Sequence, residues 1–271
     1  MKKYFEIIGI LAFALFSFYY TDKVTNIMNS KDPIMISINE YKSKYNNPCR
    51  EGYITNEGVV LGKNGDEINV IESYSNMQGK VFDEDKLVFD KLICKVSLDT
   101  LDNDYIINVN PTKNVVNIFL KVENLEYIND ILKVYSSKNA HIDLLVNGKL
   151  ISENKEYFKE LYNNGYTILY NGTNEKDYKL FYKTIKDIDN KVDIYYMSIG
   201  NEDLNIKSKA IRLKTSYYYS NNILLNTQKN LEKGSFIIFK ENKNTLEESS
   251  SVINYIKAKK IDIIDLKESL K

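Results

Sequence analysis

Seven short apolar segments alternate with helical patterns through the second half of the chain, and this alternation restricts the fold more than any other feature. Unbroken apolar segments of this length are typical of strands buried on both faces of a parallel sheet. Parallel strands need long connections, usually helices, and seven repeats favour a sheet that curls into a barrel. The segments are Val115–Leu120, Ile142–Val146, Tyr166–Tyr170, Val192–Met197, Ala210–Lys214, Ser235–Phe239 and Ile261–Leu266. We therefore predict an α/β fold with a (β/α)7-type barrel at residues 113–271.

The residues before this region follow a different pattern. Short apolar pieces are separated there by Asn, Gly and Asp, which is typical of short strands joined by turns. The pieces are Tyr53–Thr55, Val59–Leu61, Ile68–Ile71, Leu87–Phe89 and Tyr105–Val109. We predict a small β-rich module at residues 48–112.

The first residues resemble an export signal. Two lysines precede an apolar run, Ile7–Tyr20, but aromatic residues stand before Thr21 where signal peptidase needs small ones. We therefore predict an uncleaved hydrophobic helix at residues 1–21 that anchors the chain in the cell membrane by a single pass. Its basic end would lie in the cytoplasm and the bulk of the chain outside, after a helical stalk at 22–47. The alternative is an N-terminal helix packed on a soluble domain.

Barrel enzymes carry their chemistry at the C-terminal ends of the strands. Here those ends offer mainly lysines and amides: Leu120-Lys121, Asn147, Asn171, Met197-Ser198, Lys214–Ser216 and Lys240-Glu241. A metal-activated water needs imidazole or carboxylate ligands that meet at one point. The chain has one histidine, His141, which precedes the second strand. We expect it at the opposite end of the barrel, as a partly buried structural residue.

Three segments resemble the polysaccharide deacetylase family in spacing and core pattern. They are NVVNIFLKVEN from Asn114, AHIDLLVNGKLISENKEYFKELYNNGYTILYNG from Ala140 and EKGSFIIFKENKNTLEESSSVINYIKAKKIDIIDLKESL from Glu232. The resemblance extends from Asn114 to Leu270. It implies a distorted (β/α) barrel, which in that family removes acetyl groups from chitin-like or peptidoglycan sugars.

The catalytic motifs that the resemblance implies have lost their chemistry at the matching positions. Two adjacent aspartates, a general base and a metal ligand, match Leu120 and Lys121. Two histidine ligands match Asn171 and Glu175, and the general-acid histidine matches Lys240. The two remaining motifs lack their arginine and their tryptophan. We therefore predict no bound metal or other cofactor and no deacetylase activity.

The charges at these positions suggest two interpretations. Lys121 and Lys240 border the vacated metal position, and Glu123, Glu175 and Glu241 are near them in the sequence. Either the two ammonium groups replace the cation and form ion pairs with these carboxylates, or all five side chains are ordinary solvated charges.

An alternative keeps catalysis. A rearranged deacetylase site, acting on N-acetylated glycans, would use carboxylates from Glu123, Glu175, Asp177 or Glu241. That alternative requires a carboxylate pair and a ligand cluster to meet in one cleft.

The role that we favour is non-catalytic binding of cell-wall glycan or of an envelope protein partner; the barrel could also serve only as a docking body. Tyr166, Tyr170, Tyr195 and Tyr217 are candidate sugar-stacking residues, although tyrosines on strands more often pack in cores. Lys+Arg and Asp+Glu balance at 37 each, and there is no long basic run, which argues against a nucleic-acid partner.

The two cysteines, Cys49 and Cys94, show no CxxC spacing. They form a disulfide if the chain is exported, or remain two buried thiols.

Overall fold

The computed structural model describes residues 15, 17, 32–45, 47–101, 104–200 and 210–271 of the chain. These residues form two compact units. Unit 1 takes residues up to Pro48 together with Gly65–Leu92, and unit 2 takes Cys49–Asn64 and Ile93–Lys271. This division runs through the predicted module at 48–112.

Most of the predicted anchor lies outside the described residues, which include only Leu15 and Ser17 of that segment. Among the residues that are described, no helix combines the length and the apolar character needed to cross a bilayer.

In its described part, unit 1 contains two α-helices, a 3-10 helix and a two-stranded antiparallel sheet. Its elements are α2 (Pro33–Lys44), β3 (Gly65–Ile68), α3 (Val70–Met77), the 3-10 helix η1 (Glu84–Lys86) and β4 (Phe89–Leu92). Ile34 and Ile38 of α2 are buried against Ile68 and Met77. The second half of the predicted stalk is therefore a helix with one packed face.

The predicted strand Ile68–Ile71 is wrong beyond its first residue. Asn69 Oδ1 accepts a hydrogen bond from the backbone N–H of Glu72 at 3.0 Å and so caps α3. An asparagine in that position satisfies an otherwise orphaned helix donor, and this favours the helix over a continued strand.

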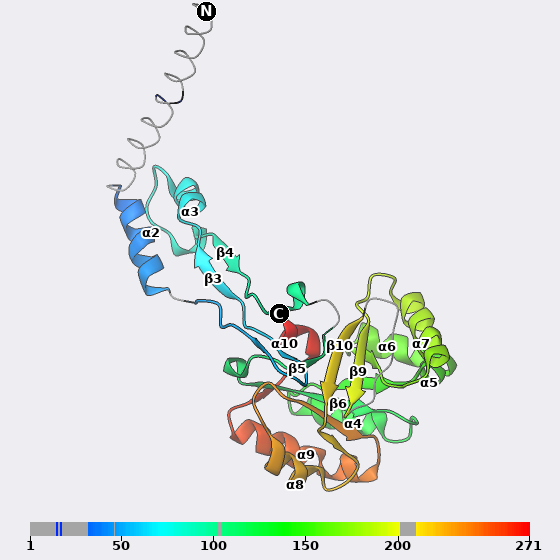
Figure 1. The fold of residues 1–271 in the computed structure, drawn as a ribbon. Coiled ribbons are helices and arrows are strands. Elements are labelled where there is room, and N and C mark those ends of the chain that lie inside the picture. Colours follow the sequence, from blue (N-terminus) through cyan, green and yellow to red (C-terminus); the bar gives the residue numbers. More distant parts are fainter. Residues whose placement is uncertain (1–14, 16, 18–31, 46, 102–103, 201–209) are drawn as a thin grey trace, which may run out of the picture. The chain divides into compact units, whose positions relative to one another are not determined.

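Unit 2 is built on one curled sheet, for which the described residues supply eleven strands (Figure 1). The strand order is β1-β2-β5-β10-β9-β8-β7-β6-β12-β11, and β13 pairs with β6 outside this path. The β1–β2 pair is antiparallel, and every pairing from β2 to β11 is parallel. The strands are β1 (Tyr53–Ile54), β2 (Val59–Val60), β5 (Ile106–Asn108), β6 (Val115–Lys121), β7 (Asp143–Val146), β8 (Ile168–Tyr170), β9 (Tyr195–Ile199), β10 (Ile211–Thr215), β11 (Tyr218–Tyr219), β12 (Phe236–Lys240) and β13 (Asp262–Ile263).

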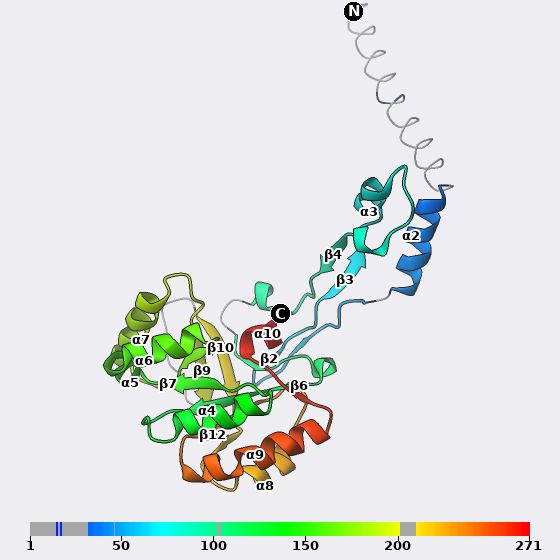
Figure 2. The same ribbon diagram turned by 180° about the vertical axis from the view of Figure 1, so that it is seen from behind.

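Helices cover the outer face of this sheet, with α5 beside α7 and α8 beside α9 (Figures 1 and 2). The helices on this face are α4 (Ile128–Ser137), α5 (Gly148–Glu153), α6 (Lys155–Asn163), α7 (Glu175–Ile188), α8 (Ile223–Asn230) and α9 (Lys243–Ala258). The short helix α10 (Leu266–Leu270) instead packs Leu266 and Leu270 against inward-facing strand residues, and the 3-10 helices are η2 (Leu98–Thr100) and η3 (Pro111–Lys113).

All seven predicted barrel segments contain a strand, and the predicted α/β fold is confirmed. The last segment keeps only the short β13, because Asp265 accepts a hydrogen bond from the N–H of Glu268 at 2.9 Å and caps α10 there. The sequence patterns did not indicate β11, whose two tyrosines pair with Ile238 and Phe239 of β12.

Alternate residues of each strand face opposite sides of the sheet. In β6, Val116, Ile118 and Leu120 pack with the helices in an outer cluster, whereas Val115 and Phe119 belong to an inner cluster. The inner cluster also takes one residue in two from β7, β8, β9 and β12 and so fills the interior of the curled sheet. This alternation determines which strand-end residues face the barrel mouth.

The curl brings the β5–β10 side of the sheet to β12. Thr215 Oγ1 donates a hydrogen bond to Phe236 O at 2.7 Å, and Val109 N–H donates to Gly234 O at 3.0 Å. Gly234 has a φ of 85°, and a Cβ there would lie 2.2 Å from the carbonyl oxygen of Val109. Only glycine fits this close approach, so the residue is required for the distorted barrel to close.

Cys49 and Cys94 form a disulfide with a Cα–Cα distance of 5.6 Å. Of the two alternatives that the sequence left open, the structure contains the disulfide. Both residues belong to unit 2, next in sequence to the positions where the chain passes between the units.

Candidate functional site

At the ends of β6, β7, β8 and β12, the strand alternation sends four polar side chains toward the barrel mouth. Residues two apart on a strand face the same side of the sheet, and we call this the same parity. Lys121 therefore faces the same side as Phe119, and Lys240 the same side as Ile238, and both of these apolar residues belong to the inner cluster. Asn147 and Asn171 follow β7 and β8 with the parity of Leu145 and Leu169, again of the inner cluster. Leu120 has the opposite parity and is fully buried under the helices. Of the two positions that match the family's aspartates, only Lys121 faces the mouth.

A pocket of about 370 Å³ lies at the ends of β6, β7 and β8, and we call it the rim pocket. Its polar lining residues are Lys121, Glu123, Asn147, Asn171 and Thr173. Two amides are partly committed to the fold: Asn147 Oδ1 accepts from Leu150 N–H at 2.8 Å, and Asn171 Nδ2 donates to Met197 O at 2.9 Å. The rim pocket therefore presents an ammonium group, a carboxylate, a hydroxyl and the remaining amide atoms.

The two rim lysines have different partners. Lys240 Nζ lies 2.8 Å from Glu123 Oε2, and the hydrogen bond with this carboxylate raises the pKa of Lys240. Lys121 Nζ lies over the Tyr218 ring, 5.2 Å from its centroid, and forms no ion pair with any described carboxylate. The interpretation that lysines form ion pairs at the mouth therefore holds for Lys240 and not for Lys121.

No profile of a known protein family matches this sequence, and no curated protein matches it. Solved structures do. The wild-type form of BA3943, a CE4 family pseudoenzyme from Bacillus anthracis, matches with a TM-score of 0.66 and 17% identity, over 89% of this chain and 96% of the other. A mutant of that pseudoenzyme with restored enzymatic activity matches with a TM-score of 0.66 and 15% identity, over 89% and 98% of the two chains.

The peptidoglycan N-acetylglucosamine deacetylase Bc1960 matches with a TM-score of 0.54 and 15% identity, over 61% of this chain and 92% of the other. This chain has the CE4 deacetylase fold. At these identities the likeness concerns the fold, so the chemistry of this CE4-fold chain follows from its own residues.

The rim pocket of this CE4-fold chain does not fit a divalent metal. Its charged groups are the ammonium of Lys121 and the carboxylate of Glu123, which is paired with Lys240. Zinc and the other divalent transition metals take mainly carboxylate, imidazole or thiolate ligands, and a neighbouring ammonium repels any divalent cation. Across the described ranges, the one group of three ligand-type side chains close enough to share an ion is Cys49, Glu51 and Cys94, and its two sulfurs form the disulfide.

The four carboxylates of the rearranged-site alternative have separate structural roles. Glu123 pairs with Lys240, and Glu175 Oε1 lies 2.8 Å from Lys179 Nζ. Asp177 accepts hydrogen bonds from the N–H groups of Gly148 and Lys149 at 2.8 and 2.9 Å, at the start of α5.

Glu241, the fourth of these carboxylates, has the parity that faces away from the mouth. Its side chain is buried and accepts from Tyr127 N–H at 2.7 Å, and burial raises the pKa of its carboxyl group. The structure therefore does not bring these four carboxylates together as a catalytic pair with a ligand cluster.

Three of the four candidate sugar-stacking tyrosines do not line the rim pocket. Tyr170 is fully buried under α7, against Tyr178 and Phe181, because its parity faces the helices. Tyr195 is buried in the inner cluster. Tyr166 precedes β8, at the end of the sheet opposite the rim pocket, and its ring lies 5.5 Å from that of His141.

Tyr217, the fourth candidate, lines a different pocket. This pocket of about 350 Å³ lies beyond the end of β10 and is also lined by Tyr53, Lys214 and Glu232. Tyr217 is thus accessible to a ligand, but it does not line the rim pocket.

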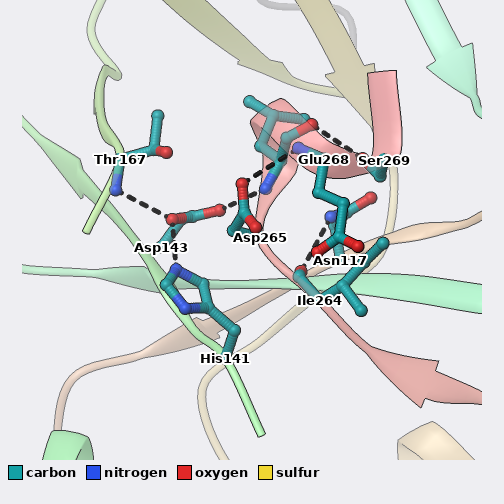
Figure 3. Close-up of polar contacts among 9 residues, drawn as sticks. Asn117, His141, Asp143, Thr167, Ile264, Asp265, Glu268 and Ser269 are labelled. Carbon is teal, nitrogen blue, oxygen red and sulfur yellow. Dashed lines mark hydrogen bonds and ion pairs between the residues drawn. The ribbon is translucent and has the colours of Figure 1, made fainter. Parts of the chain in front are cut away.

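A buried carboxylate that accepts hydrogen bonds at both oxygens lies at the other end of the barrel (Figure 3). Asp143 is fully buried; its Oδ1 accepts from Thr167 N–H at 2.9 Å, and its Oδ2 accepts from Leu266 N–H at 2.8 Å. His141 Nε2 lies 2.8 Å from Asp143 Oδ1. Burial alone would lower the pKa of His141, but the hydrogen bond and charge of Asp143 outweigh it, and the net shift is upward.

His141 therefore lies where the sequence placed it, as a partly buried structural residue. Asp143 was missed as an important residue. The available signal was an aspartate with inward parity at the start of the apolar segment IDLLV.

Proposed function

We propose that this protein is a membrane-anchored, extracytoplasmic CE4-fold protein without deacetylase activity, and that its rim pocket binds cell-wall glycan. The observation that carries the proposal is the donor set at the mouth, where an ammonium and two amides stand at strand ends that the fold uses for catalysis. Such groups suit hydrogen bonding to hydroxyl and acetamido groups and provide no means to activate water.

Two similar structures support this reading. One carries the description of a pseudoenzyme, and it matches nearly the whole of its own length. Another is a peptidoglycan deacetylase with the same fold, which makes cell-wall glycan the ligand class to test first.

The proposed location has independent support. The Cys49–Cys94 disulfide suits an oxidising compartment outside the cytoplasm. The apolar run Ile7–Tyr20 after two lysines has the pattern of a signal anchor. An envelope protein in the same compartment is the other candidate partner, but no feature of the rim pocket favours a protein ligand over a glycan.

We expect the full-length chain to bind isolated peptidoglycan and soluble N-acetylchitohexaose. Thr173→Trp puts a large ring at an exposed position of the rim pocket and should weaken binding about tenfold or more by occupying the ligand's space. Calorimetric titration and co-sedimentation with peptidoglycan measure the effect.

The matched control is Ser136→Trp, which adds the same ring at an exposed position of α4 and should leave binding unchanged. Absence of binding by the wild-type chain, or equal binding by both variants, would contradict the proposal.

A further inference from the structure

We propose that the rim pocket selects glycans that carry an anionic group, with Lys121 Nζ as the residue that binds the anion. This inference rests on the proposed glycan-binding function and specifies its ligand class. It follows from the balance of charges at the mouth.

The first observation is that Lys121 is the one cationic residue that lines the rim pocket, and it forms no ion pair with a carboxylate of the described residues. Its ammonium lies over the ring of Tyr218, at 5.2 Å from the centroid. A cation–π contact fixes the position of an ammonium without cancelling its charge, so its remaining N–H donors stay available for an anion.

The second observation is that Glu123, the carboxylate of the rim pocket, is already paired with Lys240. Glu123 Oε2 and Lys240 Nζ are 2.8 Å apart, and the two lysines end adjacent strands in register, Lys240 beside Lys121. The formal charges of these three side chains sum to one positive charge, and the carboxylate of Glu241, which also acts on Lys240, is buried and faces away from the mouth. Because Glu123 forms its ion pair with Lys240, it does not pair with Lys121.

The third observation concerns the uncharged lining. Asn147 uses its oxygen to cap α5, and its Nδ2 has no hydrogen-bond partner among the described residues. Thr173 is exposed and adds a hydroxyl group. An ammonium, an amide N–H and a hydroxyl that line one pocket can each donate to a carboxylate or phosphate bound there. Such charge-assisted hydrogen bonds are stronger than those to neutral sugar groups.

The test compares ligands that differ in charge. The wild-type chain is titrated at low salt with N-acetylchitohexaose, which is neutral, with a hyaluronan hexasaccharide, which carries carboxylates, and with a glucosylated polyglycerol phosphate, which carries sugars and phosphodiesters. We expect at least one anionic ligand to bind about tenfold more tightly than the neutral one, and the preference to weaken as salt is raised. The tighter of the two anionic ligands identifies carboxylate or phosphate as the natural group.

Lys121→Gln keeps most of the side chain and removes the charge, so the anionic ligands should lose their advantage over N-acetylchitohexaose. Lys133→Gln, at an exposed position of α4, changes the net charge equally and should keep the wild-type preference. Melting curves establish that both variants are folded.

Equal binding of neutral and anionic ligands by the wild-type chain overturns this inference and leaves the proposed function standing. An anion preference that survives in Lys121→Gln also overturns it. Failure of all three ligands and of peptidoglycan to bind overturns both proposals.

Discussion

Asp143→Ala is expected to lower the free energy of unfolding by about 3–5 kcal/mol. The carboxylate is fully buried and accepts from the N–H groups of Thr167 and Leu266, with His141 Nε2 at 2.8 Å. Alanine leaves these buried groups without a partner, and unsatisfied buried donors are costly. The bond to Leu266 also joins α10 to the barrel across 123 positions of sequence, so the C-terminal helix should loosen first.

Denaturant unfolding of the full-length chain measures the loss, and amide hydrogen exchange at Leu266 reports its location. Asp262→Ala is the control, because Asp262 is an exposed aspartate on β13, and its loss should change stability by less than about 0.5 kcal/mol. Equal stability of the two variants, or unchanged protection of the Leu266 amide in Asp143→Ala, would show that Asp143 does not hold α10.

Reduction of the Cys49–Cys94 disulfide is expected to cost about 4 kcal/mol of stability, which corresponds to a fall in Tm of about 10 °C. The bond closes a loop with a sequence separation of 45 residues, and opening it releases conformational entropy in the unfolded chain. This loop includes all of Gly65–Leu92, the second segment of unit 1.

Thermal melting with and without a phosphine reductant measures the effect. The double variant Cys49→Ala with Cys94→Ala should melt near the reduced wild-type chain and should not respond to the reductant. The expected disulfide would be contradicted if the wild-type chain, purified without reductant, had one free thiol per cysteine, or if its Tm did not change on reduction.

Much of the barrel could be predicted from sequence because its strands are continuous apolar runs. Val115–Leu120 and Ser235–Phe239 differ from the observed β6 and β12 by one residue. The period of two then assigns the ends: Lys121 and Lys240 face the mouth, whereas Leu120 and Glu241 face away. Applied to Tyr170, the same rule places it under the helices, so its burial was predictable.

Other features depend on contacts that a local pattern does not contain. Ile68–Ile71 reads as a strand by composition, and only the Asn69 cap turns the chain into α3. The partners of Asp143 include the N–H of Leu266, far along the chain, so its importance appears only when α10 is in place. Lys240 likewise pairs with Glu123 and not with its neighbour Glu241, because Glu241 faces away from the mouth and Glu123 Oε2 lies 2.8 Å from Lys240 Nζ.

The central claim is that the mouth of this barrel cannot activate water. Its direct test is acetate release from N-acetylated peptidoglycan and N-acetylchitohexaose by the full-length chain, with zinc, cobalt or manganese added. We predict that the chain releases no more acetate than a control with the same metal and no protein. The reason is that an ammonium group lies at the mouth and the nearby carboxylates have other partners. Metal-dependent turnover that disappears in Glu175→Gln would contradict the account.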